Sequence, residues 1–169
     1  MRVQLIAISC LALVAACGGG DSQTPLLDAA PDTAIDTLPP ADAPPGFCAN
    51  EDRDDDYVEG MVKVGANGYS VVLVTSEPAP DPKGNYAWNI RVLDPAMAPV
   101  DNLTIKVVPF MPDHGHGTSV QAIVTPSGNG NYAISPINLF MTGLWAVRHG
   151  LRDATDTEVD AVVYRFCVD

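Results

Sequence analysis

The chain has 169 residues, enough for one domain with accessory segments, and a formal net charge of −12. Residues 18–56 hold ten acidic residues and one basic residue, whereas residues 57–169 hold eleven acidic and seven basic residues. Binding to nucleic acid requires a basic patch, and the sequence carries none, so we expect no nucleic-acid partner.

Residues 1–16 have the pattern of an export signal. Arg2 precedes an apolar run, Val3 to Ala16, that is too short to span a membrane and ends in small residues. The end of this run, Leu13-Val14-Ala15-Ala16-Cys17, resembles the lipobox of bacterial lipoproteins, which implies cleavage before Cys17 and acylation of that cysteine. A secretory signal with an incidental cysteine is the alternative. Acylated Cys17 would anchor the chain in the lipid of the bacterial cell envelope, at the outer membrane or at the periplasmic face of the inner membrane.

We expect residues 17–56 to form a disordered tether. Residues 18–46 consist mainly of Gly, Asp, Ala, Thr and Pro without an aromatic residue, so they cannot bury enough apolar surface to offset the entropy of ordering. The acidic run from Glu51 to Asp56 suggests calcium as an alternative. This run lacks the spacing, the central glycine and the final glutamate of an EF-hand loop, and we therefore interpret it as a solvated charged segment.

The four cysteines have different expected fates. Cys10 leaves with the signal and Cys17 carries lipid, so Cys48 and Cys167 remain in the exported chain. Two cysteines in an oxidising compartment most simply form a disulfide. Such a bond would close a loop of about 118 residues, to which the chain-entropy model assigns roughly 4–5 kcal/mol. A pair of metal thiolates or of free thiols is the alternative.

From residue 57 onward the sequence predicts short strands. The residues Tyr86, Trp88, Ile90 and Val92 alternate with polar ones, as in a half-buried strand, and Gly- and Asn-rich turns separate the runs. These features predict an all-β domain at residues 57–169, an antiparallel Ig-like β-sandwich of seven or eight strands. We expect Trp88 and Trp145 in its core, with ligand stacking as the alternative for either. The expected strands are residues 57–64, 69–75, 86–93, 103–109, 118–124, 131–135, 143–149 and 159–167.

Successive strands of such a sandwich mostly alternate in direction, which predicts the loops that share an end. Loops 76–85, 110–117 and 136–142 fall at one end. Both remaining cysteines fall at that end as well, which supports their pairing independently of the cysteine count. His149 ends a strand that runs away from this end, and we exclude it from any site there.

Several motifs of this domain occur together in one known family. They are Met111-Pro112 followed by His114-Gly115-His116-Gly117, a turn of sequence Gly-Asn-Gly-Asn-Tyr, and Phe140-Met141 shortly before Trp145. In these motifs the chain resembles the YtkA-like domain family of bacterial exported and membrane-anchored proteins, over about residues 66–166. The resemblance implies an Ig-like sandwich. It implies little about activity, although the family often occurs near copper or respiratory-chain functions.

The same loops carry candidate metal ligands. Met111, His114, His116 and Met141 combine thioether and imidazole donors, which suit copper and particularly Cu(I). Zinc would prefer the two histidines with a carboxylate, which Asp113 could supply. The alternative is a glycine-rich loop whose histidines bond to backbone carbonyls, with both methionines packed over the end of the core.

No catalytic motif stands out in the sequence, and we do not expect an enzyme. Neither a nucleophile elbow nor a Walker-type loop is present, and Ser119 near His116 lacks the third group of a triad. Two functions remain. The first is a membrane-tethered module that binds copper as a carrier or buffer. The second is a structural or interaction module that docks another protein of the cell envelope without a metal.

Overall fold

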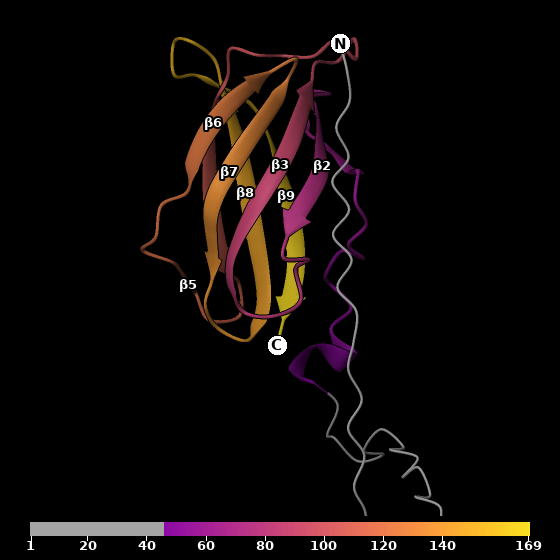
Figure 1. Ribbon diagram of the computed structural model, residues 1–169, viewed down its shortest axis with the longest axis vertical. Coiled ribbons are helices and arrows are strands. Elements are labelled where there is room, and N and C mark those ends of the chain that lie inside the picture. Colours follow the sequence, from indigo (N-terminus) through magenta and orange to yellow (C-terminus); the bar gives the residue numbers. More distant parts are fainter. Residues whose placement is uncertain (1–45) are drawn as a thin grey trace, which may run out of the picture. The chain divides into compact units, whose positions relative to one another are not determined.

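The computed structural model describes residues 46–169, and the expected signal, Cys17 and residues 18–45 of the expected tether lie outside this range. Within it, nine strands form two antiparallel sheets that face each other, as predicted for an all-β sandwich (Figure 1). The elements are η1 (Phe47–Asn50), β1 (Met61–Val64), β2 (Ser70–Glu77), β3 (Gly84–Leu93), β4 (Thr104–Met111), β5 (His116–Gly117), β6 (Ile123–Gly128), β7 (Asn131–Leu139), β8 (Gly143–Arg152) and β9 (Glu158–Val168). One sheet has the order β1-β2-β3-β7-β6 and the other the order β5-β4-β8-β9. In residues 46–169 no helix is long and apolar enough to cross a membrane.

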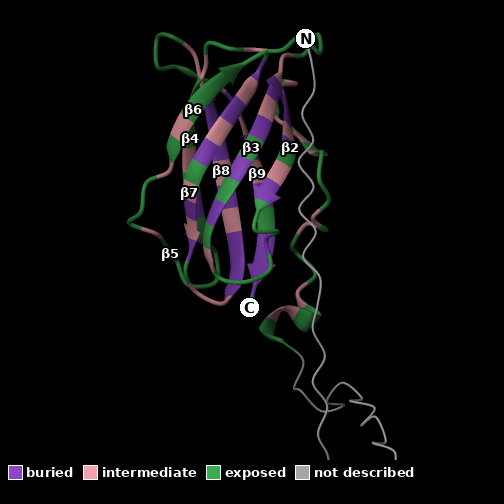
Figure 2. Ribbon diagram, viewed as in Figure 1, coloured by how far each residue is buried: buried purple, intermediate pink, exposed green. Residues whose placement is uncertain are grey.

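The inward faces of both sheets make one apolar core. Trp88 of β3 and Trp145 of β8 are at most 1% exposed, so the prediction that both tryptophans fill the core is confirmed. The buried positions alternate with exposed or intermediate ones along β3 and β7, as Figure 2 shows. Each fully buried large apolar side chain stabilises the fold by about 1.5–3 kcal/mol relative to exposure.

The prediction of one strand at residues 118–124 was wrong. The chain forms the two-residue strand β5 beside β4. Residues 118–122 have no strand structure, and β6 begins only at Ile123. The reason is that β5 belongs to one sheet and β6 pairs with β7 in the other, so residues 118–122 change sheets. The alternation of apolar and polar residues in this segment also does not match its burial, because Val120, an apolar position of the pattern, is 39% exposed.

Residues 47–56, which the sequence assigned to the tether, contact the sandwich. Cys48 and Cys167 form the predicted disulfide, with 5.6 Å between their Cα atoms. At the other end of this segment, the Asp55 N–H donates to the Arg165 carbonyl at 2.7 Å, and a carboxylate oxygen of Asp55 accepts the Arg165 N–H at 2.8 Å. These bonds lay the segment along β9, where a row of backbone groups would otherwise be unpaired.

One end of the sandwich gathers the loops that the strand directions predicted. In Figure 1 the C-terminus, β5 and the β7–β8 connection lie together at the lower end, opposite the β6–β7 turn. The backbone N–H of Lys83, in the β2–β3 loop, donates to the Asp169 carbonyl at 3.1 Å, and its Nζ donates to Thr142 Oγ1 at 3.2 Å. We call this the hairpin end, after the β4–β5 hairpin that it contains.

Candidate functional site

The histidine loop is a tight hairpin between β4 and β5. Met111 pairs with His116 across the ladder. The turn closes through the Gly115 N–H, which donates to the Met111 carbonyl at 2.9 Å. Gly115 has φ of 71°, a left-handed conformation that disfavours side chains other than glycine. The motif therefore fixes a sharp turn that presents two histidines on one short hairpin.

The two histidine rings of this hairpin lie next to each other. The ring centroids of His114 and His116 are 5.6 Å apart. His114 is exposed and His116 is half-buried. The Nδ1 of His116 lies 3.2 Å from the Gly117 carbonyl oxygen. An imidazole that donates from Nδ1 to a carbonyl keeps its Nε2 lone pair free for a metal, so this contact suits a ligand as well as a structural histidine.

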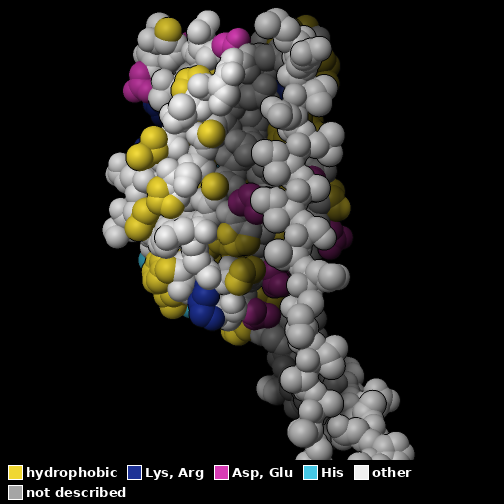
Figure 3. Space-filling view, viewed as in Figure 1, with side chains coloured by type: hydrophobic (Ala, Val, Ile, Leu, Met, Phe, Trp, Pro, Cys, Tyr) yellow, Lys and Arg dark blue, Asp and Glu magenta, His cyan; other side chains and the backbone are white. Residues whose placement is uncertain are grey.

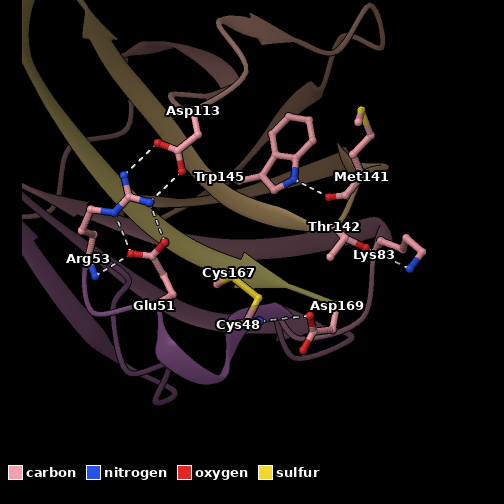
Figure 4. Close-up of a disulfide and its surroundings, with 10 residues drawn as sticks. All are labelled: Cys48, Glu51, Arg53, Lys83, Asp113, Met141, Thr142, Trp145, Cys167 and Asp169. Atoms are coloured by element: carbon pink, nitrogen blue, oxygen red, sulfur yellow. Dashed lines mark hydrogen bonds and ion pairs between the residues drawn. A yellow bond between two sulfur atoms is a disulfide. The ribbon is translucent and has the colours of Figure 1, made fainter. Parts of the chain in front are cut away.

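Both candidate methionines lie on the core side of the hairpin end. Met111 is 1% exposed, and because it stands directly opposite His116 in the ladder, the two side chains project from the same face. Met141 is half-buried against the core, and its carbonyl accepts the Trp145 Nε1–H at 2.8 Å (Figure 4). The hairpin thus brings three candidates together, and the β7–β8 loop supplies the fourth.

An aromatic contact joins the two loops. Phe140, the residue before Met141, has its ring centroid 6.1 Å from that of His116 and 5.7 Å from that of Trp145. The His116 ring therefore packs against Phe140, which in turn packs against the buried Trp145. His149, which the sequence excluded from the site, lies inside the sandwich with its ring stacked on Trp88 at 5.5 Å.

The carboxylate of Asp113, next to His114 in the sequence, is engaged in an ion pair with Arg53. Arg53 holds Asp113 through two hydrogen bonds of 2.8 and 2.6 Å, and it also holds Glu51 (Figure 4). The hydrogen bonds from Arg53 lower the pKa of Asp113 below its usual value. Sequence reasoning missed Arg53 because it lies 60 residues from Asp113 in an acidic run, where nothing in the pattern indicates its partner.

The ligand chemistry available at the hairpin end follows from these contacts. Within residues 46–169, no three side chains of His, Cys, Asp or Glu assemble as a metal-ligand cluster. Met111, opposite His116 in the ladder, and Met141, in the next loop, carry thioether sulfur, a donor that favours a soft ion such as Cu(I) over Zn²⁺ or harder cations.

Comparison with known families places this hairpin in a recognised domain. A family model described as YtkA-like matches residues 63–149, which is half of the chain. The chain belongs to the YtkA-like family. The match runs from β1 into β8 and includes the histidine hairpin and Met141, whereas Arg53 and both cysteines of the disulfide lie outside the matched residues of this YtkA-like chain. Neither the curated proteins nor the solved structures contain a match to it. YtkA-like sandwiches are not a known enzyme family, and the family and the fold fit a binding module.

Proposed function

We propose that this YtkA-like domain is an exported module, tethered to the bacterial cell envelope through acylated Cys17, that binds copper at the hairpin end as a carrier or buffer. The observation that carries the proposal is the adjacency of the His114 and His116 rings, 5.6 Å apart on one hairpin. The pairing of His116 with Met111 supports it, because residues directly opposite each other in an antiparallel ladder project from the same face of the sheet.

The donor set matches the chemistry of Cu(I). The two imidazoles supply nitrogen, and Met111 and Met141 supply sulfur from the core side. Arg53 engages both oxygens of Asp113, so the hard ligand that zinc would use is taken. Protons compete with the metal for imidazole nitrogen, and copper affinity should therefore fall as the solution is acidified.

Competition against a chromophoric Cu(I) chelator tests the proposal. The wild-type chain should withdraw one Cu(I) per molecule from the chelator, and the double variant H114A/H116A should withdraw none. The matched control is His149→Phe, which changes the third histidine but keeps an aromatic ring in the core against Trp88. Equal copper uptake by the wild type and the double variant would reject the copper site.

A second function is favoured by exposed aromatic side chains at the same end. Phe47, Phe110 and Phe140 are 67%, 40% and 45% exposed. Phe47 lies 3.6 Å from the position that a Cβ on Gly143 would take, so it belongs to the same end as Phe140. The space-filling view shows apolar side chains gathered near the lower end, with histidine atoms at its lower left edge (Figure 3). Aromatic side chains are enriched at protein interfaces.

This second candidate is a module that docks another envelope protein through the hairpin end. Photo-crosslinking from position 47 in intact envelopes should then give one discrete adduct. The adduct should persist in H114A/H116A and disappear in Phe140→Ser. An adduct lost only from the histidine variant would favour the copper function instead.

A further inference from the structure

The sheet β5-β4-β8-β9 has one edge that the described part of the chain leaves partly open. At its β9 edge, the segment before β1 bonds to the strand through Asp55 and Arg165. At the opposite edge, β5 pairs with β4 only at Phe110 and Met111. Within the described residues, positions 104–109 of β4 pair with β8 on one side alone. An edge strand of this kind presents backbone groups to which another strand can pair.

The direction of the carbonyls shows which backbone groups face this open edge. The Met111 carbonyl accepts the Gly115 N–H and so faces the β5 side. The Pro109 carbonyl faces the same side, because its oxygen lies 2.5 Å from the position that a Cβ on Gly117 would take. Backbone groups change sides with a period of two residues, so the N–H and C=O of Val107 face this edge as well. None of the turn and loop backbone hydrogen bonds in the described part of the chain reaches Val107.

A groove lies along this edge of β4. It has a volume of about 240 Å³ and is lined by residues 106–109 of β4 and by four of residues 118–122, the segment that changes sheets. In Figure 1 that segment bows away from the sandwich, at the left of the view. Val108 and Val120 give the groove partly exposed apolar surface. The volume is below the roughly 300–1,000 Å³ of small-molecule pockets, so a peptide strand fits this edge better than a drug-sized ligand does.

The charge of the groove indicates the chemistry of its partner. Residues 57–169 contain eleven acidic and seven basic side chains, yet the described residues that line the groove include Lys106 and no acid. Lys106 is exposed and makes no ion pair with a described residue. Glu158, whose pKa is lowered by its hydrogen bond from Arg148 and also by the charge of Lys106, is already held by that arginine. The ammonium of Lys106 is therefore available to an acidic group from outside.

We propose that the open edge of β4 binds an extended segment of another protein, which adds as a strand beside β4 and carries an acidic side chain opposite Lys106. The segment pairs with the N–H and C=O of Val107. The apolar side chains on either side of its acid turn inward and fill the groove between β4 and Val120. Strand addition of this kind takes its affinity from main-chain hydrogen bonds and its specificity from alternate side chains. This surface is separate from the hairpin histidines, and the inference does not rest on copper binding.

Titration of the isotope-labelled full-length chain, in detergent micelles, with a synthetic peptide tests the proposal. The probe is acetyl-Thr-Val-Glu-Val-Thr-amide, which places one acid between two apolar residues. Binding should shift the amide resonance of Val107 and slow its hydrogen exchange at least tenfold at saturation, because that N–H gains a partner.

Three matched peptides separate the contributions of backbone and charge. Methylation of both valine nitrogens should abolish binding, because those N–H groups face β4. Methylation of the glutamate nitrogen, which faces away from β4, should have a much smaller effect. Lysine in place of the glutamate should weaken binding on the order of fivefold, because it puts like charges opposite each other.

Exchange of the charge in the protein tests Lys106 itself. In Lys106→Glu the preference should reverse, so that the lysine peptide binds more tightly than the glutamate peptide. Lys83→Glu makes the same change of charge in the β2–β3 loop and should keep the wild-type preference. The peptide series on the wild type decides the proposal even if K106E fails to fold.

The proposal is overturned if the peptide leaves the Val107 amide unchanged, or if methylation of the valine nitrogens does not weaken binding. An unreversed preference in folded K106E would overturn the role of Lys106. Slow exchange at Val107 without peptide would also overturn the proposal, because the edge would then already be covered. Protection that rises with protein concentration would identify a second copy as the cover, and protection that does not would identify the N-terminal part of the same chain.

Discussion

At the scale of single residues, the clearest energetic feature is His149 in the core. Its ring stacks on Trp88 at 5.5 Å and meets Tyr164 edge-on at 5.6 Å, and it is 0% exposed. Burial lowers the pKa of His149 to about 4, because the charged imidazolium would lose its hydration. His149 is thus a structural histidine that differs from the two at the surface hairpin.

This burial predicts that the fold is weakened by mild acid. An unfolded chain binds a proton at His149 near pH 6.5, whereas the folded chain binds it only near pH 4. The contribution of neutral, buried His149 to the free energy of unfolding is fully present above pH 6.5. It is lost as the pH falls toward 4, and the loss is about 3 kcal/mol in total. Urea unfolding at a series of pH values should show this loss in the wild type and a much smaller one in His149→Phe. Parallel pH profiles for the two chains would contradict the assignment.

Gly143 is a second residue with a measurable role. Its φ of 129° disfavours any other residue, and an added Cβ would come within 3.0 Å of Met111 Cε. We expect Gly143→Ala to lower the free energy of unfolding by about 1–3 kcal/mol, mainly through backbone strain, since the end of the Met111 side chain can move. Thermal unfolding measures the effect, and an unchanged melting temperature would show that the start of β8 is not strained by a side chain.

At the scale of elements, alternation predicted most strands because one face of each sheet is buried. β3, with Trp88 and Tyr86 inward, is the clearest case. The pattern failed at residues 118–124, where the chain passes between sheets and pairing cannot continue. The histidine hairpin was visible as a motif because glycine spacing marks a turn. The pairing of Arg53 with Asp113 was not visible in the sequence, because an ion pair between residues 60 positions apart leaves no local signal.

The segment that contains η1 gives a prediction about the disulfide. Cys48 and Cys167 are 119 residues apart, and the chain-entropy model assigns roughly 4–5 kcal/mol to a loop of this length. Replacing both cysteines with alanine should lower the free energy of unfolding by a few kcal/mol, as measured with urea. Peptide mapping without reductant should recover the two cysteines in one linked fragment. Two free thiols in the folded wild type would contradict the bond.

At the scale of the whole molecule, the chain combines an expected lipid anchor with a YtkA-like sandwich whose hairpin end carries the candidate site. The anchor lies outside the described residues and remains a prediction from Val14-Ala15-Ala16-Cys17. Cys17→Ser should leave the precursor uncleaved or free of acyl chains, because the thiol that is modified is lost. Mass spectrometry of the mature protein decides this, and an unmodified chain that begins elsewhere would reject lipidation.

X-ray absorption at the copper edge of the Cu(I)-loaded protein tests the central claim most directly, because it reports the atoms bound to the metal. The account predicts both imidazole nitrogen and thioether sulfur around one copper per chain. It also predicts that the imidazole signal is lost in H114A/H116A, and that the sulfur signal is reduced in Met141→Leu. A wild-type spectrum without sulfur, or one that is unchanged in H114A/H116A, would contradict a copper site built from the hairpin histidines and the methionines behind them.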